Sequence, residues 1–222
     1  MPDADALESS PALEPAAVTP VVRKRPKPGE RRVQILQALA AMLEQPGAER
    51  ITTAALAARL EVSEAALYRH FASKAQMFEG LIEFIEQSVF SLINQILARN
   101  ATATEEGAPD AATGLRQAGQ LAAMLLQFAE KNPGMTRVMV GDALVFENER
   151  LQQRMNLFFD KIEATLRQCL RPASGATPSV DAQVQASVLT AFLVGRLQRF
   201  ARSGFKRLPS EHLDASLVRL LG

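Results

Sequence analysis

Between residues 52 and 71 the chain carries hydroxyl, guanidinium and imidazole side chains at helical spacing, interleaved with short apolar residues. Tyr68 can donate its hydroxyl hydrogen to a phosphate, and Arg69 can either clamp a phosphate or bind the O6 and N7 atoms of guanine. Thr52 and Ser63 are suited to cap helix N-termini, where free N–H groups and a partial positive charge favour a bound phosphate. Side chains of these types predict non-covalent binding of duplex DNA.

Two short helices must position these side chains, and a turn at Glu61-Val62-Ser63 separates them. Apolar spacing marks one face of each helix: Leu56, Ala57 and Leu60 in the first, and Ala66, Leu67, His70 and Phe71 in the second. This layout is typical of a helix-turn-helix, whose second helix enters the major groove. The predicted DNA-contacting residues are Thr52, Thr53, Ser63, Glu64, Ala65, Tyr68, Arg69, His70 and Lys74. The alternative is an ordinary helical hairpin whose Tyr and Arg cover a solvated face.

Three neighbouring features favour a DNA-binding domain over that hairpin. An upstream helical pattern would complete a three-helix core, with apolar residues at Val33, Ile35, Leu36, Leu39, Met42 and Leu43. The capping-box spacing of Ser73 and Gln76 predicts that a long helix begins directly afterwards, with Lys74 in its first turn near the DNA. Residues 23–32 hold six Lys or Arg and one Glu, a balance of +5 in a chain whose formal total is +1.

The remaining composition argues against an enzyme or a metalloprotein. Cys169 is the single cysteine, so the chain has no intramolecular disulfide and no zinc-ligand cluster, as expected in a reducing cytoplasm. The two histidines, His70 and His212, fall in separate segments, and no nucleophile–base pair or Gly-rich phosphate loop emerges. We therefore expect no catalytic site, metal or cofactor. No apolar run approaches the roughly 20 residues of a membrane span, which predicts a cytoplasmic protein without a membrane partner.

The sequence divides into three predicted regions. Residues 1–28 contain six prolines and little apolar periodicity, which predicts a disordered arm whose basic end either touches DNA or is a solvated tail. Residues 29–73 form the helix-turn-helix domain, and residues 74–222 form a helical domain for dimerisation and partner binding. In the latter, apolar spacing predicts helices over 74–98, 114–131, 135–146, 148–171 and 180–203, with a polar loop near 100–113.

The helix predicted over residues 180–203 is apolar on more than one face, so it needs two packing partners. One is the core of its own subunit and the other is a second copy of the chain; a single thick monomeric core is the alternative. A dimer also suits DNA, because two helix-turn-helix domains about 34–36 Å apart address successive major-groove faces of a palindrome. The predicted interface residues are Val188, Ala191, Phe192, Gly195 and Arg199.

The stretch TTAALAARLEVSEAALYRHFASKAQMF, followed by a helical body, resembles the TetR family of dimeric DNA-binding regulators. The resemblance is specific over residues 30–85. It implies an all-α, TetR-like fold with an N-terminal three-helix helix-turn-helix domain and a C-terminal helical domain. One departure is Glu61, where the family usually has glycine, because a left-handed backbone costs a residue with a side chain about 1 kcal/mol or more. We expect this glutamate to lower stability rather than to remove function.

Within that family, residues 49–88, 130–168 and 200–209 are similar to the nucleoid occlusion factors. The resemblance implies a division inhibitor on the nucleoid that binds palindromic chromosomal sites, with room for several dimers per site, and engages the tubulin-like protein FtsZ. It also implies an FtsZ-contacting surface formed by Phe84, Met124, Phe128, Lys131 and Asn132. Phe84 fits that role only if its helical face is exposed, and Asn132 before Pro133 is equally suited to ending a helix.

A ligand-released transcriptional repressor is the alternative function, because most TetR-like bodies enclose a small-molecule pocket. With 5% aromatic residues, one tyrosine and no tryptophan, this chain lacks the aromatic lining of a broad drug pocket, although Met and Phe can line one. We therefore expect no small-molecule ligand. A pocket with several convergent polar groups would favour the alternative.

Overall fold

The structure is a computed structural model that describes residues 29–45, 51–102, 110–175 and 178–221. Within those residues the chain is all-α, as predicted, and contains no strand. The longer helices are α1 (Glu30–Leu43), α4 (Lys74–Thr102), α5 (Ala111–Lys131), α7 (Glu149–Leu170) and α8 (Pro178–Arg202). The shorter ones are α2 (Thr53–Arg59), α3 (Glu64–Tyr68), α6 (Pro133–Met139), η1 (Asp142–Leu144), η2 (Arg171–Ala173) and α9 (Leu213–Leu221).

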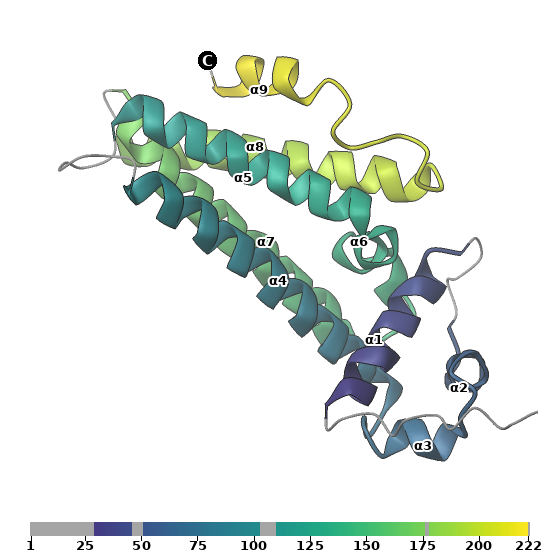
Figure 1. Ribbon diagram of the computed structural model, residues 1–222. Helices are drawn as coiled ribbons and strands as arrows, with labels where there is room; N and C mark the ends of the chain where they lie inside the picture. Colours follow the sequence, from purple (N-terminus) through teal and green to yellow (C-terminus); the bar gives the residue numbers. More distant parts are fainter. Residues whose placement is uncertain (1–28, 46–50, 103–109, 176–177, 222) are drawn as a thin grey trace, which may run out of the picture.

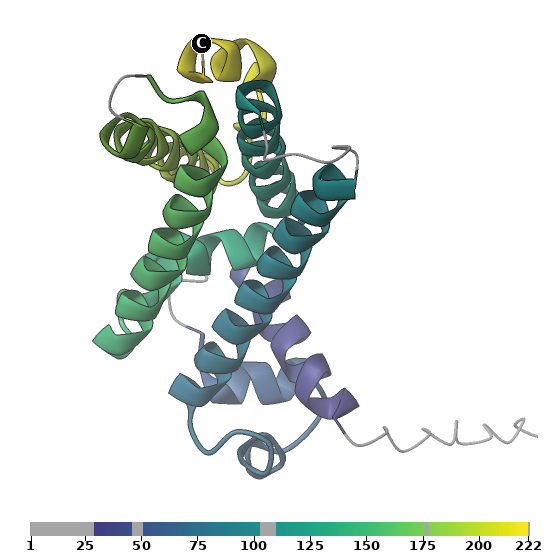
Figure 2. The ribbon, with the colours of Figure 1, turned by 90° about the vertical axis from the view of Figure 1, so that its left-hand side faces the viewer.

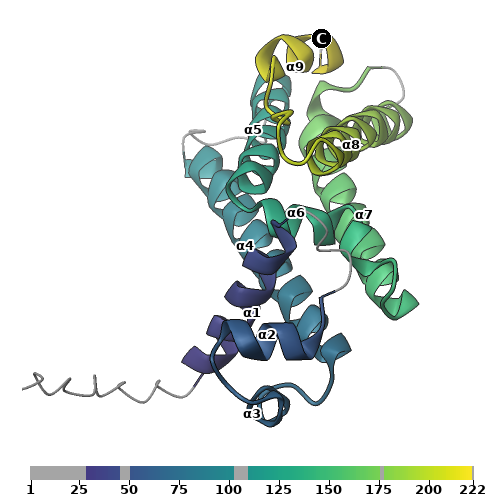
Figure 3. The ribbon, with the colours of Figure 1, turned by 90° about the vertical axis from the view of Figure 1, so that its right-hand side faces the viewer.

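Helices α1, α2 and α3 pack together at one end of the molecule, where α3 lies outermost (Figures 1 and 3). Their shared core contains Ile35, Leu39, Leu56, Leu67 and Phe71, each no more than 1% exposed. These are apolar positions that the sequence pattern predicted to face inward. Burying them fixes the angle between α2 and α3, so the polar face of α3 points away from the protein.

Helix α4 links this three-helix unit to the rest of the chain and belongs to the core along most of its length (Figure 2). By length and composition its segment Lys74–Asn100 could cross a membrane, with a mean hydropathy of 1.2, which differs from the expectation that no apolar run is long enough. Leu81, Ile85 and Val89 are nevertheless fully buried, and α4 packs against α1, α5 and α7. Core packing therefore accounts for part of the apolar run, since 28% of its most apolar window is buried.

Helices α5, α7 and α8 form the body, with α7 and α8 sharing its most extensive contact. Their core includes Leu121, Leu125, Leu166 and Leu193, and Phe158 packs edge-to-face against Phe90 of α4 and against Phe159. The Phe90–Phe158 pair, with ring centroids 5.8 Å apart, joins α4 to α7, while the Phe158–Phe159 pair lies within α7.

Two predicted boundaries were wrong, and one helix was missed. The helix predicted over 135–146 is two pieces, α6 and η1, because Gly141 takes a left-handed conformation (φ 84°) between them. Helix α9 was not predicted. The polar loop near 100–113 is shorter than predicted, since α4 continues to Thr102 and α5 begins at Ala111; residues 103–109 and the proline-rich arm over 1–28 lie outside the described residues.

Candidate nucleic-acid interface

The two predicted helix caps are present. The Thr52 hydroxyl accepts a hydrogen bond from the Ala55 N–H at 3.1 Å, and the Ser63 hydroxyl accepts one from the Ala66 N–H at 3.3 Å. Each bond satisfies one of the N–H groups that a helix start leaves unpaired. The other N–H groups of the first turns stay available to water or to an anion, which is the local geometry that a phosphate requires.

The turn between α2 and α3 is closed through Glu61, which has the left-handed backbone that its position predicted (φ 52°). The Glu61 and Val62 N–H groups donate to the carbonyls of Ala58 and Ala57 at 3.1 and 3.0 Å. These bonds pair the last carbonyls of α2 and place Ser63 where it can begin α3.

Three predicted DNA-contacting residues form a small network on the exposed side of α2 and α3. The Thr53 hydroxyl donates to the Glu64 carboxylate at 2.5 Å, and the Tyr68 hydroxyl lies 3.5 Å from the Thr53 oxygen. Tyr68 is 45% exposed, and its neighbours Ala65 and Arg69 are also exposed. The network ties the Tyr68 hydroxyl on α3 to the first residue of α2.

His70 lies just beyond the end of α3 and is exposed, so it does not share the buried face on which the spacing placed it. Its carbonyl accepts a hydrogen bond from the Arg32 guanidinium at 2.9 Å, and the same guanidinium stacks 4.2 Å from the centre of the Phe71 ring. Arg32, predicted only as part of a basic segment, thus ties α1 to the end of α3. Nothing in the local sequence pattern identifies that structural role.

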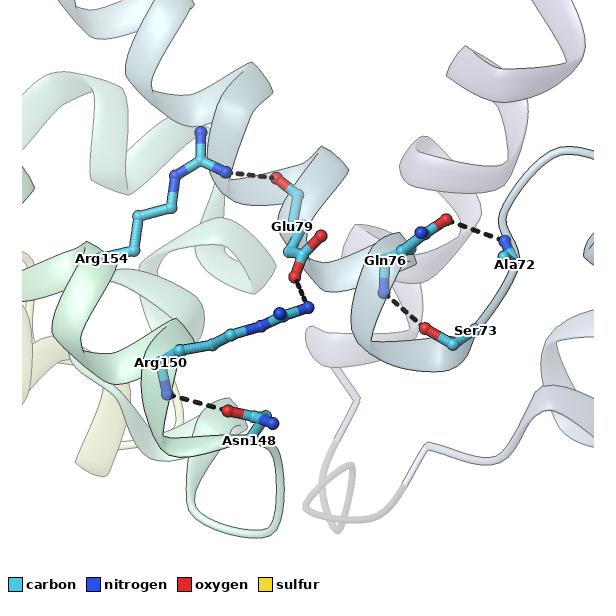
Figure 4. A network of polar contacts seen from close by, with 7 residues as sticks. All are labelled: Ala72, Ser73, Gln76, Glu79, Asn148, Arg150 and Arg154. Atoms are coloured by element: carbon cyan, nitrogen blue, oxygen red, sulfur yellow. Dashed lines mark hydrogen bonds and ion pairs between the residues drawn. The ribbon is translucent and has the colours of Figure 1, made fainter.

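Lys74 is directed toward the body. Its ammonium group pairs at 2.5 Å with the carboxylate of Glu147, a side chain only 11% exposed in the turn between η1 and α7. One half of the predicted capping box is present beside it, because the Ser73 hydroxyl accepts from the Gln76 N–H (Figure 4). The Gln76 side chain accepts from the N–H of Ala72, one residue before the cap, and not from that of Ser73.

Two further ion pairs extend this contact along α4. Arg150 pairs with Glu79, and the Arg154 guanidinium donates to the Glu79 carbonyl (Figure 4). Arg154 also pairs with Glu86 at 2.7 Å. The three pairs, Lys74–Glu147, Arg150–Glu79 and Arg154–Glu86, are called the polar junction below. It joins the start of α7 to the end of α4 that adjoins the helix-turn-helix domain.

A second contact joins that domain to the body through backbone. Helix α6 packs on α1 at Gly134, where a Cβ, if the residue had one, would stand 1.9 Å from the Ala40 carbonyl oxygen. Only glycine fits there, because no real Cβ approaches an oxygen so closely. The backbones of α1 and α6 are therefore in direct contact.

The residues predicted to contact a partner line α4 and α5. Phe84 is 38% exposed, so its face of α4 is open to solvent, while Met124 and Phe128 are half-buried and Lys131 is exposed. Asn132 ends α5, and its side-chain amide donates to the Phe128 carbonyl at 2.8 Å. The helix-ending role of Asn132 is thus present in the structure.

The predicted dimer residues follow α8 on the side away from its buried face. Val188 is 49% exposed, Ala191 and Arg199 are exposed, and Gly195 has no neighbouring atom within 4 Å of the space beside its Cα. Phe192 packs partly on the core and carries the Arg196 guanidinium 4.8 Å above its ring. This face of α8 has no partner within the described chain.

An interior cavity and an open cleft are the places to consider for small-molecule binding. The interior between α4, α5, α7 and α8 holds a cavity of only about 10 Å³, lined by Val89, Leu121, Ile162 and Leu193 among others. An open cleft of about 480 Å³ lies between η1, α7 and α8. Its polar groups are Asp142, Gln152, Asn156, Asp160 and Gln198, beside Met139, Met155 and Phe159.

The reactive side chains form no catalytic arrangement in the described residues. Burial raises the pKa of the Cys169 thiol to about 11, so the group is a neutral, unreactive thiol near pH 7. No group of three or more His, Cys, Asp or Glu side chains there could hold a metal ion.

Comparisons with known proteins agree with this architecture. Residues 35–81 match the family model for bacterial regulatory proteins of the tetR family, and residues 113–221 match the SlmA-like model described as tetracyclin repressor-like, C-terminal domain. The fold is similar to the fatty acid degradation regulator FadR of Bacillus halodurans, with a TM-score of 0.68 at 15% identity over 89% of this chain and 97% of that one. It is also similar to Bacillus subtilis FadR in complex with stearoyl-CoA, with a TM-score of 0.63 at 12% identity over 86% and 97% of the two chains.

A capped helix-turn-helix carried by an all-helical body defines a DNA-binding regulator of the TetR type rather than an enzyme. Closer relatives are named nucleoid occlusion factor SlmA. The protein of Vibrio cholerae serotype O1 is 52% identical over 188 residues, 83% of this chain and 90% of the relative, and that of Idiomarina loihiensis is 48% identical with the same coverage. The chain belongs to the SlmA family of nucleoid occlusion factors.

Proposed function

We propose that this protein binds palindromic chromosomal sites as a dimer and, while on DNA, antagonises FtsZ assembly so that no septum forms over the nucleoid. The observation that carries the proposal is the exposed polar face of α3, with its capped N-terminus and its tyrosine. The names of the relatives support the cellular role. On this proposal the protein acts in the cytoplasm, on the nucleoid.

On DNA, α3 enters the major groove with Ala65 facing the bases. Ser63 and Thr52 bring helix N-termini to phosphates, while Tyr68 donates to a phosphate oxygen, because phosphate contacts fix the register of the protein on the duplex. Arg69 either reads guanine or clamps the backbone. The Thr53 hydroxyl bond to Glu64 supports the proposal, since it gives that carboxylate a partner beside the anionic DNA.

Dimerisation uses the exposed face of α8. Val188 and Ala191 supply apolar area and Gly195 allows two helices to approach closely, while Arg199 closes the polar end of the face. Burying exposed valines between two copies removes apolar surface from water, which drives association. Several dimers on neighbouring DNA would raise the local concentration of partner-binding surfaces and so give avidity.

FtsZ binds the exposed surface of α4 and α5 on this proposal, with Phe84, Met124 and Phe128 as apolar anchors and Lys131 and Asn132 at the edge. Binding is coupled to DNA because α4 is continuous with the domain that holds the DNA, and linkage makes the coupling reciprocal. Equal FtsZ affinity with and without DNA would contradict this coupling.

Replacing Lys131 by glutamate tests the partner surface. We expect Lys131→Glu to leave DNA affinity unchanged and to weaken FtsZ binding by roughly tenfold, because a repulsive charge replaces an attractive one at the rim of the surface. FtsZ polymer disassembly by the DNA-bound protein is the readout. If the variant and the parent chain antagonise FtsZ assembly equally, Lys131 does not belong to the FtsZ-binding surface.

The function is tested by capturing genomic fragments on the purified protein and sequencing them. Many palindromic sites scattered over the chromosome would support nucleoid occlusion. One or two sites beside its own gene or a transporter gene would instead indicate a local repressor.

The open cleft favours one alternative, a repressor released by a small molecule, since its volume lies within the range of ligand pockets and several polar groups converge there. The cleft carries Asp142 and Asp160 and no cation among its lining residues, so the phosphates of an acyl-CoA would be repelled. Stearoyl-CoA, the molecule bound to Bacillus subtilis FadR, serves as the probe. Release of DNA at micromolar stearoyl-CoA would support the repressor, and unchanged DNA affinity would count against that ligand class.

A further inference from the structure

The open cleft between η1, α7 and α8 brings together two carboxylates from different elements. Asp142 begins η1 and Asp160 lies midway along α7, and both line the same cleft of about 480 Å³. Neither carboxylate has a hydrogen-bond or ion-pair partner within the described part of the chain. No Lys, Arg or His belongs to the lining, so two negative charges share one concave site without a neutralising side chain.

These two charges decide which class of ligand the cleft can hold. Carboxylates in a concavity raise the local concentration of cations, because walls of low dielectric focus the field between them. Phosphates and nucleic acids are repelled for the same reason. A metal ion is a poor fit as well, since calcium and magnesium take about six or more oxygen ligands and no group of three or more His, Cys, Asp or Glu among the described residues could hold one. The charges therefore favour an organic cation.

The rest of the lining suits the body of such a cation. The side-chain carbonyls of Gln152, Asn156 and Gln198 can accept hydrogen bonds from amine N–H groups. Met155 is buried and offers an apolar, adaptable surface to methylene groups. The half-buried Phe159 ring also lines the cleft, and an aromatic face attracts ammonium groups. The cleft thus combines acceptors for amines with apolar contacts for the chain between them.

We propose that the cleft binds an aliphatic polyamine, a linear chain of methylene groups that carries two or more ammonium groups. Two of the ammonium groups pair with Asp142 and Asp160, and the methylene groups between them cover Met155. Hydrogen bonds between ammonium and carboxylate are charge-assisted and stronger than those between neutral groups, so two carboxylates favour a ligand with at least two cations. The inference goes beyond the proposed function, because the site needs neither DNA nor FtsZ.

The cleft borders the face of α8 that is proposed for dimerisation. Val194 and Gln198 line the cleft, and the residues that follow them in the sequence, Gly195 and Arg199, belong to that face. A second copy of the chain is therefore the competing occupant. The polyamine is favoured, because most of the dimerisation face is apolar, as at Val188, and burying two unpaired carboxylates under apolar groups costs free energy.

The test is a calorimetric titration of spermidine into the full chain without DNA, since DNA phosphates attract polyamines themselves. We expect saturable binding of one molecule per chain. The double variant Asp142→Asn/Asp160→Asn keeps the size of both side chains and removes both charges. We expect its spermidine affinity to be lower by roughly tenfold or more at about 50 mM salt, because two charge-assisted contacts are lost. Equal affinity of the variant and the parent chain would refute the site.

The matched control is Glu149→Gln/Asp214→Asn, which removes two exposed carboxylates from α7 and α9. It should bind spermidine like the parent chain. If both double variants lose affinity equally, spermidine is held by the general charge of the protein and the cleft is refuted. Mg²⁺ at the same concentration should not displace spermidine. Complete displacement would show a loose counterion rather than a bound amine and would also overturn the proposal.

A second variant tests the cleft without changing its charge. Phe159→Leu keeps an apolar side chain but removes the aromatic face, and we expect spermidine affinity to be about two- to fivefold lower. Melting temperatures followed by circular dichroism show whether each variant is folded. If the monomeric Val188→Glu chain binds spermidine and the dimeric parent chain does not, a second copy covers the cleft and the proposal is wrong. DNA and FtsZ binding, measured separately, should be unchanged in Asp142→Asn/Asp160→Asn, so the proposed function stands or fails independently of the cleft.

Discussion

Glu61 occupies a left-handed position at the turn of the helix-turn-helix, where its side chain is sterically penalised. We expect Glu61→Gly to raise the free energy of unfolding by about 1 kcal/mol, which corresponds to a melting temperature roughly 2–4 °C higher for a chain of this size. Thermal unfolding followed by circular dichroism measures it. Glu61→Ala is the control, since alanine removes the carboxylate but keeps the Cβ; equal melting temperatures for both variants would contradict the backbone explanation.

Tyr68 carries the phosphate contact proposed for α3. We expect Tyr68→Ala to weaken DNA binding by about tenfold to a hundredfold, because a hydrogen bond to a charged group contributes about 1.5–3 kcal/mol. Titration at fixed salt is required, since phosphate contacts depend on ionic strength. Tyr68→Phe distinguishes the contribution of the hydroxyl from that of the aromatic ring. If both variants bind DNA with the affinity of the parent chain, Tyr68 does not contact DNA.

Residues whose role depends on near neighbours could be predicted from the sequence. Thr52, Ser63 and the Ser73–Gln76 pair act over three or four positions, so spacing alone identified them. The partner of Lys74 lies 73 positions away in the turn before α7, and no local pattern indicates it. Arg32 is a similar case, because its stacking on Phe71 joins α1 to the turn between α3 and α4, 39 positions away in the sequence.

At the scale of elements, the long helices were predictable because each keeps one apolar stripe over many turns. Boundaries were less accurate where one residue decides them: Gly141 divides α6 from η1 through its backbone conformation. Helix α9 carries a detectable signal in the spacing of Leu213, Leu217 and Leu221, although its short length makes that signal weak. The dimer face of α8 and the residues proposed for DNA and FtsZ remain predictions.

The polar junction offers a test at the same scale. Lys74 pairs with Glu147 in the structure, and on the proposed function it also lies near DNA. We expect Glu147→Gln to raise DNA affinity up to about tenfold at low salt, because phosphate no longer competes with a carboxylate for the ammonium group. Glu149→Gln changes the same charge at an exposed position two residues away. An equal gain in both variants would show a general charge effect instead.

At the scale of the whole molecule, the proposed function makes DNA binding depend on two copies of the chain. We expect Val188→Glu to yield a folded monomer with palindrome affinity lower on the order of a hundredfold, because the two half-sites are then bound independently. Light scattering after size-exclusion chromatography gives the mass. Val218→Glu, at a 68% exposed position on α9, should leave the dimer intact. A dimeric Val188→Glu protein would place the interface on another face.

The contact of Gly134 with the Ala40 carbonyl joins α6 to the helix-turn-helix domain, whereas the polar junction joins the adjoining end of α4 to α7, and these two contacts respond to different variables. Ions weaken partly exposed charge pairs, but a backbone contact has no charge to screen. We expect rising ionic strength to loosen the contact between α4 and α7 while the contact between α1 and α6 persists. In the proposed dimer, the ionic strength inside the cell would then influence how freely the two DNA-binding domains adjust their spacing.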